Sequence, residues 1–145
     1  MEIISFNKSY IDNVKELLSV EEIDPSTLQS YNLELFENDY FQSFICLNEG
    51  EVVASISLSI RLYVLEINHI FVKNDYRGKG IAKKLINKAF EFAKENDCES
   101  VLVNTAESNE AAKKLYEKLG FKQAGKVFDY FNNNQKQVFY IKKKF

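Results

Sequence analysis

The sequence Arg77-Gly78-Lys79-Gly80-Ile81-Ala82 lies near the middle of a chain of 145 residues. It follows an apolar segment at 65–72 and opens a segment at 80–94 whose apolar residues have helical spacing. Glycine lets a backbone approach a ligand closely, and a helix N-terminus offers unpaired N–H groups. The stretch therefore predicts a phosphate or pyrophosphate site, and its alternative is a tight turn with solvated lysines. Positive charge would come from Arg77, Lys79, Lys83 and Lys84.

Two other phosphate-binding motifs fit this stretch less well. A P-loop requires G-x-x-x-x-G-K followed by Ser or Thr, and no such string occurs. A dinucleotide fingerprint requires G-x-G-x-x-G, and Lys83 occupies the third glycine position. Glu99 lies about 20 residues on, as a ribose-binding acid would, but it precedes a strand instead of ending one. A dinucleotide-binding protein stays open as an alternative.

Outward from this turn, apolar periodicity predicts a mixed α/β protein. Helical spacing predicts helices at 10–20, 25–35, 80–94 and 109–119. Period-two or short apolar runs predict strands at 3–6, 44–47, 53–60, 65–72, 101–103, 121–131 and 137–143. The strand–helix–strand unit in the middle requires one parallel pairing, and the hairpins require antiparallel ones.

A second motif lies at 109–121, where an Asn and two Ala precede Leu-Tyr-x-x-x-Gly-Phe. With this motif after Arg77–Ala82, the sequence resembles the GNAT superfamily of N-acetyltransferases, which use acetyl-CoA. That family's pyrophosphate motif is Gln or Arg, two residues, Gly, one residue, then Gly or Ala, and the resemblance covers about 65–122. It implies one domain over residues 1–145. It also implies a central, mostly antiparallel sheet with about four helices and a V-shaped split between the strand ending at Val72 and the strand at 101–103.

The resemblance also implies where acetyl-CoA would bind. The N–H groups of Gly78 to Lys83 would hold the pyrophosphate, and the main chain of Ile70, Phe71 and Val72 would pair with the pantetheine arm. The Ile70 N–H would stabilise the oxyanion of the thioester carbonyl. The implied cofactor-binding residues are Ile70, Phe71, Val72, Arg77, Gly78, Lys79, Gly80, Ile81, Ala82, Lys83, Asn109 and Tyr116. No metal is implied.

The amine would attack the thioester directly, so the reaction needs a base, an oxyanion donor and an acid for the departing thiolate. The motif makes Tyr116 the general acid; alternatively it is a core tyrosine on a helix face shared with Ala112, Leu115 and Leu119. Our candidate base is Glu66, because period two places it on one face with Ile70 and family members carry a glutamate at the matching position. Its alternative is a solvent-facing glutamate.

Two further polar residues bear on the base. His69 points to the other strand face, where we expect it to be packed or paired. Asn104 stands where family members that acetylate protein N-termini often carry glutamate, and asparagine cannot act as a base. This departure counts against N-terminal acetylation, although a water chain or a partly deprotonated substrate would replace a side-chain base.

The net charge of −2 conceals an uneven distribution. Residues 1–72 contain three basic and twelve acidic residues, a net −9, whereas residues 73–145 contain sixteen and nine, a net +7. The basic part carries the motifs for polyanionic CoA, and the acidic part favours a small cationic or lysine-like acceptor amine. A solvated acidic face is the alternative. Aromatic residues that would line an acceptor pocket, or belong to the core, are Tyr31, Phe36, Tyr40, Phe41 and Phe44.

Composition excludes several other classes. No apolar run approaches the ~18 residues of a membrane span, no secretory signal is visible, and the basic residues form no nucleic-acid patch. Cys46 and Cys98 are expected as reduced thiols of a cytoplasmic protein, a monomer or homodimer. The sequence thus predicts an acetyl-CoA-dependent amine N-acetyltransferase. The alternatives are a non-catalytic acyl-CoA-binding module and a protein N-terminal or lysine acetyltransferase.

Overall fold

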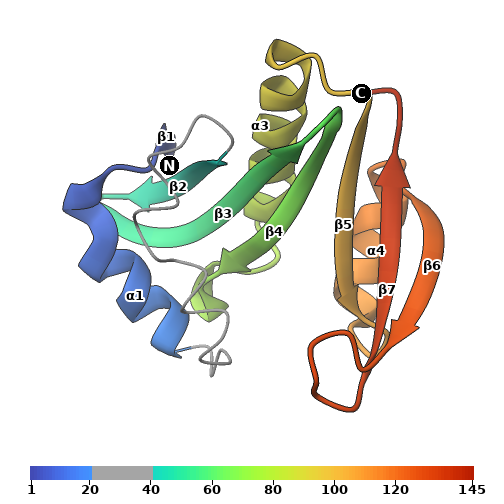
Figure 1. Ribbon diagram of the computed structural model, residues 1–145. Coiled ribbons are helices and arrows are strands. Elements are labelled where there is room, and N and C mark those ends of the chain that lie inside the picture. The colour runs from blue at the N-terminus through green and yellow to red at the C-terminus, as the bar shows by residue number, and fades with distance from the viewer. Residues whose placement is uncertain (21–40) are drawn as a thin grey trace. The chain divides into compact units, whose positions relative to one another are not determined.

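The computed structural model of the chain describes residues 1–20 and 41–145 (Figure 1). Its strands are β1 (Glu2–Ser5), β2 (Phe41–Asn48), β3 (Glu51–Arg61), β4 (Val64–Val72), β5 (Ser100–Ala106), β6 (Lys122–Phe128) and β7 (Lys136–Lys142). Its helices are α1 (Ile11–Val20), α3 (Ile81–Glu95) and α4 (Glu110–Lys118), with 3-10 turns η1 (Lys8–Tyr10) and η3 (Asn74–Tyr76).

The described part of the chain thus has three α-helices, where the sequence analysis expected about four. The additional helix was expected at 25–35, starting at Asp24-Pro25-Ser26 and carrying the apolar stripe of Leu28, Tyr31 and Leu35. That segment lies outside the described residues. So do most of the acidic residues expected to face an acceptor.

The strands form a seven-stranded sheet in the order β1-β2-β3-β4-β5-β7-β6. β4 pairs in parallel with β5, from Val64↔Ser100 to Ile67↔Val103, because α3 connects them as a crossover. The pairs β1–β2, β2–β3, β5–β7 and β6–β7 are antiparallel. This confirms the mixed, mostly antiparallel sheet, and the V-shaped split beyond the parallel pairs stays a prediction.

The chain divides into two compact units, residues 1–59 with 68–89 and residues 60–67 with 90–145. In the first unit, the spacing of apolar residues along α1 places Val14, Leu17 and Leu18 in one core cluster. Ile45, Leu47 and Val52 of β2 and β3 complete this cluster. The tight turn between the two strands uses positive φ at Glu49 (50°) and Gly50 (81°), as a two-residue hairpin requires.

Both faces of β3 are buried. Ala54, Ile56 and Leu58 on one face are fully covered, as the alternating pattern predicts for a core face. Ser55 and Ser57 on the opposite face are also buried, at 2% and 6% exposure. This face, which also carries the fully buried Val53, is therefore part of the interior although it contains two serines.

The second unit packs an aromatic core between α4 and β7. Tyr116, Phe121 and Tyr140 are buried, with Tyr116 in ring contact with both of the others at centroid distances of 5.8 and 5.7 Å. The α4 helix ends at Leu119, where Lys142 Nζ donates to the Leu119 carbonyl over 2.6 Å. A lysine at a helix C-terminus satisfies an orphan carbonyl and complements the helix dipole.

Candidate active site

The turn at Arg77–Ala82 belongs to the first unit and connects η3 to α3. Gly78 and Gly80 have φ of 75° and 79°, a region that L side chains rarely adopt. A Cβ on either glycine would meet no atom within 4 Å, so neither is required for packing. The glycines instead permit a backbone whose outer surface is open at the start of a helix. This geometry suits a ligand that binds to backbone N–H groups.

Hydrogen bonds fix the entry to this turn. Arg77 Nε donates to the Val72 carbonyl over 3.0 Å, which ties the turn back to the end of β4. Asn48 Nδ2 donates to the Tyr76 hydroxyl over 3.1 Å, which ties η3 to the end of β2. No local sequence pattern identifies Asn48 and Tyr76, because these contacting residues are 28 apart in the chain.

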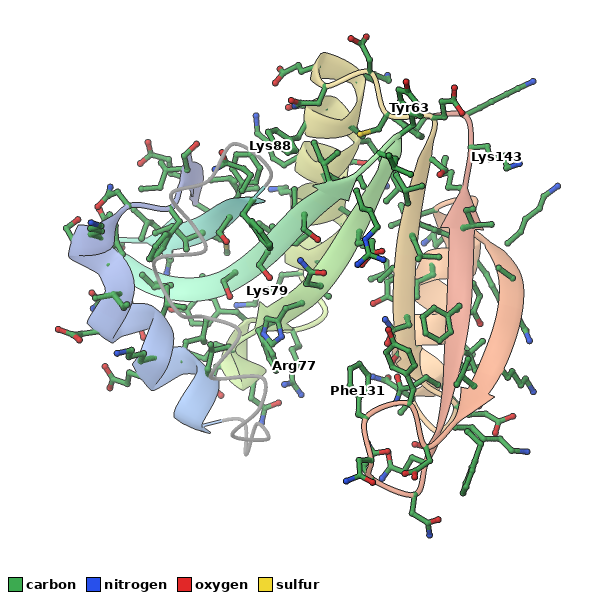
Figure 2. All side chains as sticks on the ribbon, in the orientation of Figure 1. Tyr63, Arg77, Lys79, Lys88, Phe131 and Lys143 are labelled. Atoms are coloured by element: carbon green, nitrogen blue, oxygen red, sulfur yellow. The ribbon has the colours of Figure 1, made fainter. Side chains whose placement is uncertain are left out.

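Cationic side chains surround the open backbone. Arg77 and Lys79 project from the turn (Figure 2), and both are exposed, as are Lys83 and Lys84 on the first turn of α3. Lys79 Nζ lies 5.3 Å from the centre of the Tyr76 ring, within the range of a cation–π contact. Ile81, at 2% exposure, anchors the helix start in the core. The arrangement therefore combines an open backbone with exposed positive charge, which suits a pyrophosphate group.

The end of β4 in the same unit supplies Ile70, Phe71 and Val72, all half-buried. Phe71 packs against the core cluster that contains Val14, Leu17 and Leu18 of α1, so its side chain holds this end of β4 in place. The His69 ring lies 3.8 Å from that of Phe71. Burial lowers the pKa of His69 to about 3, so the imidazole is neutral near pH 7 and too weak a base to deprotonate an ammonium group.

In the second unit, Asn109 is the N-cap of α4. Its Oδ1 accepts a hydrogen bond from the Ala112 N–H over 3.1 Å. The cap uses the oxygen, so the side-chain nitrogen is the group that could donate to a pantetheine arm. Asn109 therefore has a structural role that the motif alone did not indicate.

Tyr116 is the buried residue of α4, at 3% exposure, while Ala112, Leu115 and Leu119 are half-buried. Burial, and then the neighbouring Tyr140, raises the pKa of Tyr116 to about 12. The phenol thus stays protonated at neutral pH and can donate a proton or a hydrogen bond. Its surroundings fit a core tyrosine as well as a general acid.

The candidate base Glu66 lies on β4 between Leu65 and Ile67, which are buried at 0% and 3% exposure. Glu66 itself is half-buried and is in register with Leu102 of β5. Asn104, also on β5, is half-buried and opposite Phe139 of β7. Both positions are half-buried, and the catalytic role of Glu66 stays a prediction.

The described residues contain neither a candidate metal centre nor a helix that could cross a membrane. No group of three or more His, Cys, Asp or Glu side chains in residues 1–20 and 41–145 could hold a metal ion. Within the same ranges, no helix has the length and apolar character to cross a bilayer.

Residues 11–121 match the model of the acetyltransferase (GNAT) family, so the chain belongs to that family. The match includes both glycines of the turn, Asn109 and Tyr116. The fold and the family match place the protein in the class of acetyl-CoA-dependent N-acetyltransferases.

Among its relatives is a protein of Bacillus subtilis (strain 168) that is named as a ribosomal protein bS18-alanine N-acetyltransferase. It is 29% identical over 86% of this chain and 82% of its own length. A solved streptothricin acetyltransferase from Bacillus anthracis str. Ames, in complex with acetyl coenzyme A, is 26% identical with a TM-score of 0.69. That similarity covers 74% of this chain and 64% of the other. The ribosomal-protein-alanine N-acetyltransferase of Brucella melitensis shares the fold, with a TM-score of 0.83 over 99% of this chain and 100% of its own at 20% identity.

Proposed function

We propose that this protein transfers the acetyl group of acetyl-CoA to a primary amine, by direct attack of the amine in a ternary complex. The observation that carries the proposal is the turn with Gly78 and Gly80 at φ of 75° and 79°, open to solvent and surrounded by cationic side chains. Such a turn at a helix N-terminus supports binding of the CoA pyrophosphate.

The resemblance to the family suggests roles for other residues of the first unit. The main chain of Ile70 to Val72 pairs with the pantetheine arm, which brings the thioester carbonyl to the Ile70 N–H. That N–H stabilises the negative charge that develops on the carbonyl oxygen as the amine attacks. A backbone donor is preorganised, because the strand fixes it before the substrate binds.

Proton transfer completes the reaction. Tyr116 donates a proton to the departing CoA thiolate. Its pKa of about 12 keeps the phenol protonated at neutral pH until the thiolate forms, although the same shift makes the phenol a weaker acid. Glu66 takes the proton released by the attacking ammonium group, directly or through water.

The acceptor that we favour is the α-amino group of a polypeptide. Its support is the Bacillus subtilis relative, named for alanine acetylation on ribosomal protein bS18, which matches over 82% of its length. An α-amino group has a pKa of about 7.7–8.0, so roughly a third of it is neutral at pH 7.5. A lysine side chain, with a pKa of about 10.4, is neutral in roughly one molecule in a thousand. Because more of an α-amine is already neutral, its reaction needs less help from a base. Asn104, which cannot act as a base, is therefore compatible with this acceptor.

A small cationic amine is the second candidate. Twelve acidic residues among the first 72 would attract such a substrate. The relative from Bacillus anthracis is named as a streptothricin acetyltransferase, and the substrate in that name belongs to the class of small cationic amines.

Thiol release from acetyl-CoA tests the proposal. The acceptors are a short peptide with N-terminal alanine, the same peptide N-acetylated and carrying an internal lysine, kanamycin, and spermidine. We expect turnover with at least one of them and the highest kcat/KM with the first peptide. Tight CoA binding without turnover by any acceptor would instead support a non-catalytic acyl-CoA-binding module.

A further inference from the structure

A row of hydroxyl groups crosses β2 and β3 within the first unit. Ser43 and Ser57 are directly opposite each other in the antiparallel register, and Ser55 is two residues further along β3 on the same face. All three serines are buried, at 6%, 6% and 2% exposure. We define Ser43, Ser55 and Ser57 as the serine row.

The hydroxyls of Ser43 and Ser55 are fully covered, and neither has a hydrogen-bond partner among the described residues. A buried hydroxyl without a partner destabilises a fold, and apolar residues fill the other face of the same strand at Ala54, Ile56 and Leu58. Packing alone therefore does not explain why these positions are serine. Each of these two hydroxyls keeps a donor and an acceptor that a bound water or a ligand group would satisfy.

The row leads inward from the surface. Ser59, the next residue on this face of β3, is half-buried, and its Oγ accepts a hydrogen bond from Nδ2 of the exposed Asn68 over 2.9 Å. At the other end, the Lys73 N–H donates to the Val53 carbonyl over 2.8 Å. These two contacts bracket the part of β3 that contains Ser55 and Ser57, so these serines lie alongside residues 69–72 of β4.

That neighbouring part of β4 contains Ile70, the proposed oxyanion donor. A group bound along the serine row therefore lies next to the position where the amine attacks. The row and Asn68 carry no charged side chain, so they suit uncharged groups that both donate and accept hydrogen bonds. Peptide amides and sugar hydroxyls share this chemistry.

From this geometry we infer that the serine row is an acceptor subsite, which binds uncharged hydrogen-bonding groups adjacent to the reactive amine. The inference rests on the proposed function and extends it to the residues that select the acceptor. Peptide amides next to an N-terminal α-amine, or hydroxyls next to the amine of an aminosugar, would occupy the row.

The test compares the double variant Ser43→Ala/Ser55→Ala with wild type, using the alanine peptide, kanamycin and spermidine. Alanine removes two hydroxyls and leaves no sizeable cavity. We expect kcat/KM for the peptide or kanamycin to fall about threefold to tenfold per lost hydrogen bond, with KM for acetyl-CoA unchanged. A loss with the peptide alone assigns the row to amides, and a loss with kanamycin alone assigns it to hydroxyls. Spermidine has neither group, so its kcat/KM should not change.

Ser100→Ala is the matched control, since Ser100 is a buried serine on β5, at 6% exposure, outside the row. If the double variant only gains thermal stability and keeps wild-type kinetics with every acceptor, the inference is overturned. If the wild type acetylates none of the acceptors, the proposed function fails. Calorimetry then tests separately whether the serine row is an acceptor subsite. The CoA-loaded wild type must then bind the peptide or kanamycin more tightly than the double variant; equal binding, or none, would refute the subsite.

Discussion

Two glycines with nearly the same φ are proposed to serve different purposes in this protein. Gly50, in the β2–β3 turn, and Gly80, in the turn before α3, have φ of 81° and 79°, and a Cβ on either would meet no atom within 4 Å. Any substitution therefore introduces similar backbone strain at both. Because the strain is similar, a comparison of substitutions at the two glycines distinguishes the effect of backbone strain from the effect on ligand binding.

We expect Gly80→Ala and Gly50→Ala to destabilise the fold equally, by about 1–2 kcal/mol for a left-handed non-glycine residue. Only Gly80→Ala should weaken CoA binding, because its methyl group projects where the backbone meets the phosphates. Thermal unfolding and calorimetry with CoA measure the two effects. Equal CoA affinity in the two variants would show that the turn does not hold the cofactor.

A substitution at Tyr116 likewise distinguishes a catalytic role of this residue from a packing role. Tyr116→Phe keeps the ring contacts with Phe121 and Tyr140 and removes the hydroxyl alone. We expect kcat to fall by about 100-fold or more if the phenol is the general acid. The CoA dissociation constant should stay within about twofold of wild type. An unchanged kcat would make Tyr116 a core residue only.

His69 makes stability dependent on pH. Its pKa is about 3 in the folded state, below the usual 6.5, so the unfolded chain binds more protons between these values. Stability from this residue is therefore complete above about pH 6.5 and is lost as pH falls towards 3. Urea unfolding of wild type and His69→Gln from pH 7 to 4 should show a shallower acid loss in the variant. Parallel curves would contradict the lowered pKa.

Among the elements, α4 shows most clearly how one residue combines a structural and a binding role. Asn109 caps the helix through its oxygen, and its nitrogen is proposed to contact the pantetheine arm. Asn109→Asp preserves the capping oxygen but removes the N–H donors, while Asn109→Ala removes both. The two variants therefore distinguish helix stability from cofactor contact.

For Asn109→Ala we expect a loss of about 1 kcal/mol in unfolding free energy, since the cap is lost. Asn109→Asp should retain nearly all the stability and still bind CoA more weakly than wild type. Urea unfolding and calorimetry give both quantities. Wild-type CoA affinity in Asn109→Asp would limit this residue to its capping role.

Local patterns predict elements well and their tertiary partners poorly. Apolar spacing at 80–94 and 109–119 places α3 and α4 to within about two residues, because each helix buries one face. The alternating serines of β3 predict a strand, but the pattern cannot show that the polar face is buried as well. The contact of Asn48 with Tyr76 and the capping of α4 by Lys142 depend on residues brought together by folding, which no local period encodes.

Over the whole molecule, the uneven charge distribution agrees with the proposed division between a polyanionic cofactor and an amine acceptor. The net +7 of residues 73–145 includes the cations of the turn, whose positions the structure describes. The net −9 of residues 1–72 draws largely on the segment at 21–40, outside the described residues. The acceptor is therefore proposed from the relatives and from the serine row more than from the charge distribution.

The most direct test of the account is calorimetric titration of the intact protein with CoA and with NAD. The turn and the family motifs predict saturable binding of CoA that weakens as salt is raised, since part of the affinity comes from Arg77, Lys79 and the lysines of α3. They predict no saturable binding of NAD at the same concentrations. Binding of NAD without binding of CoA would contradict the account.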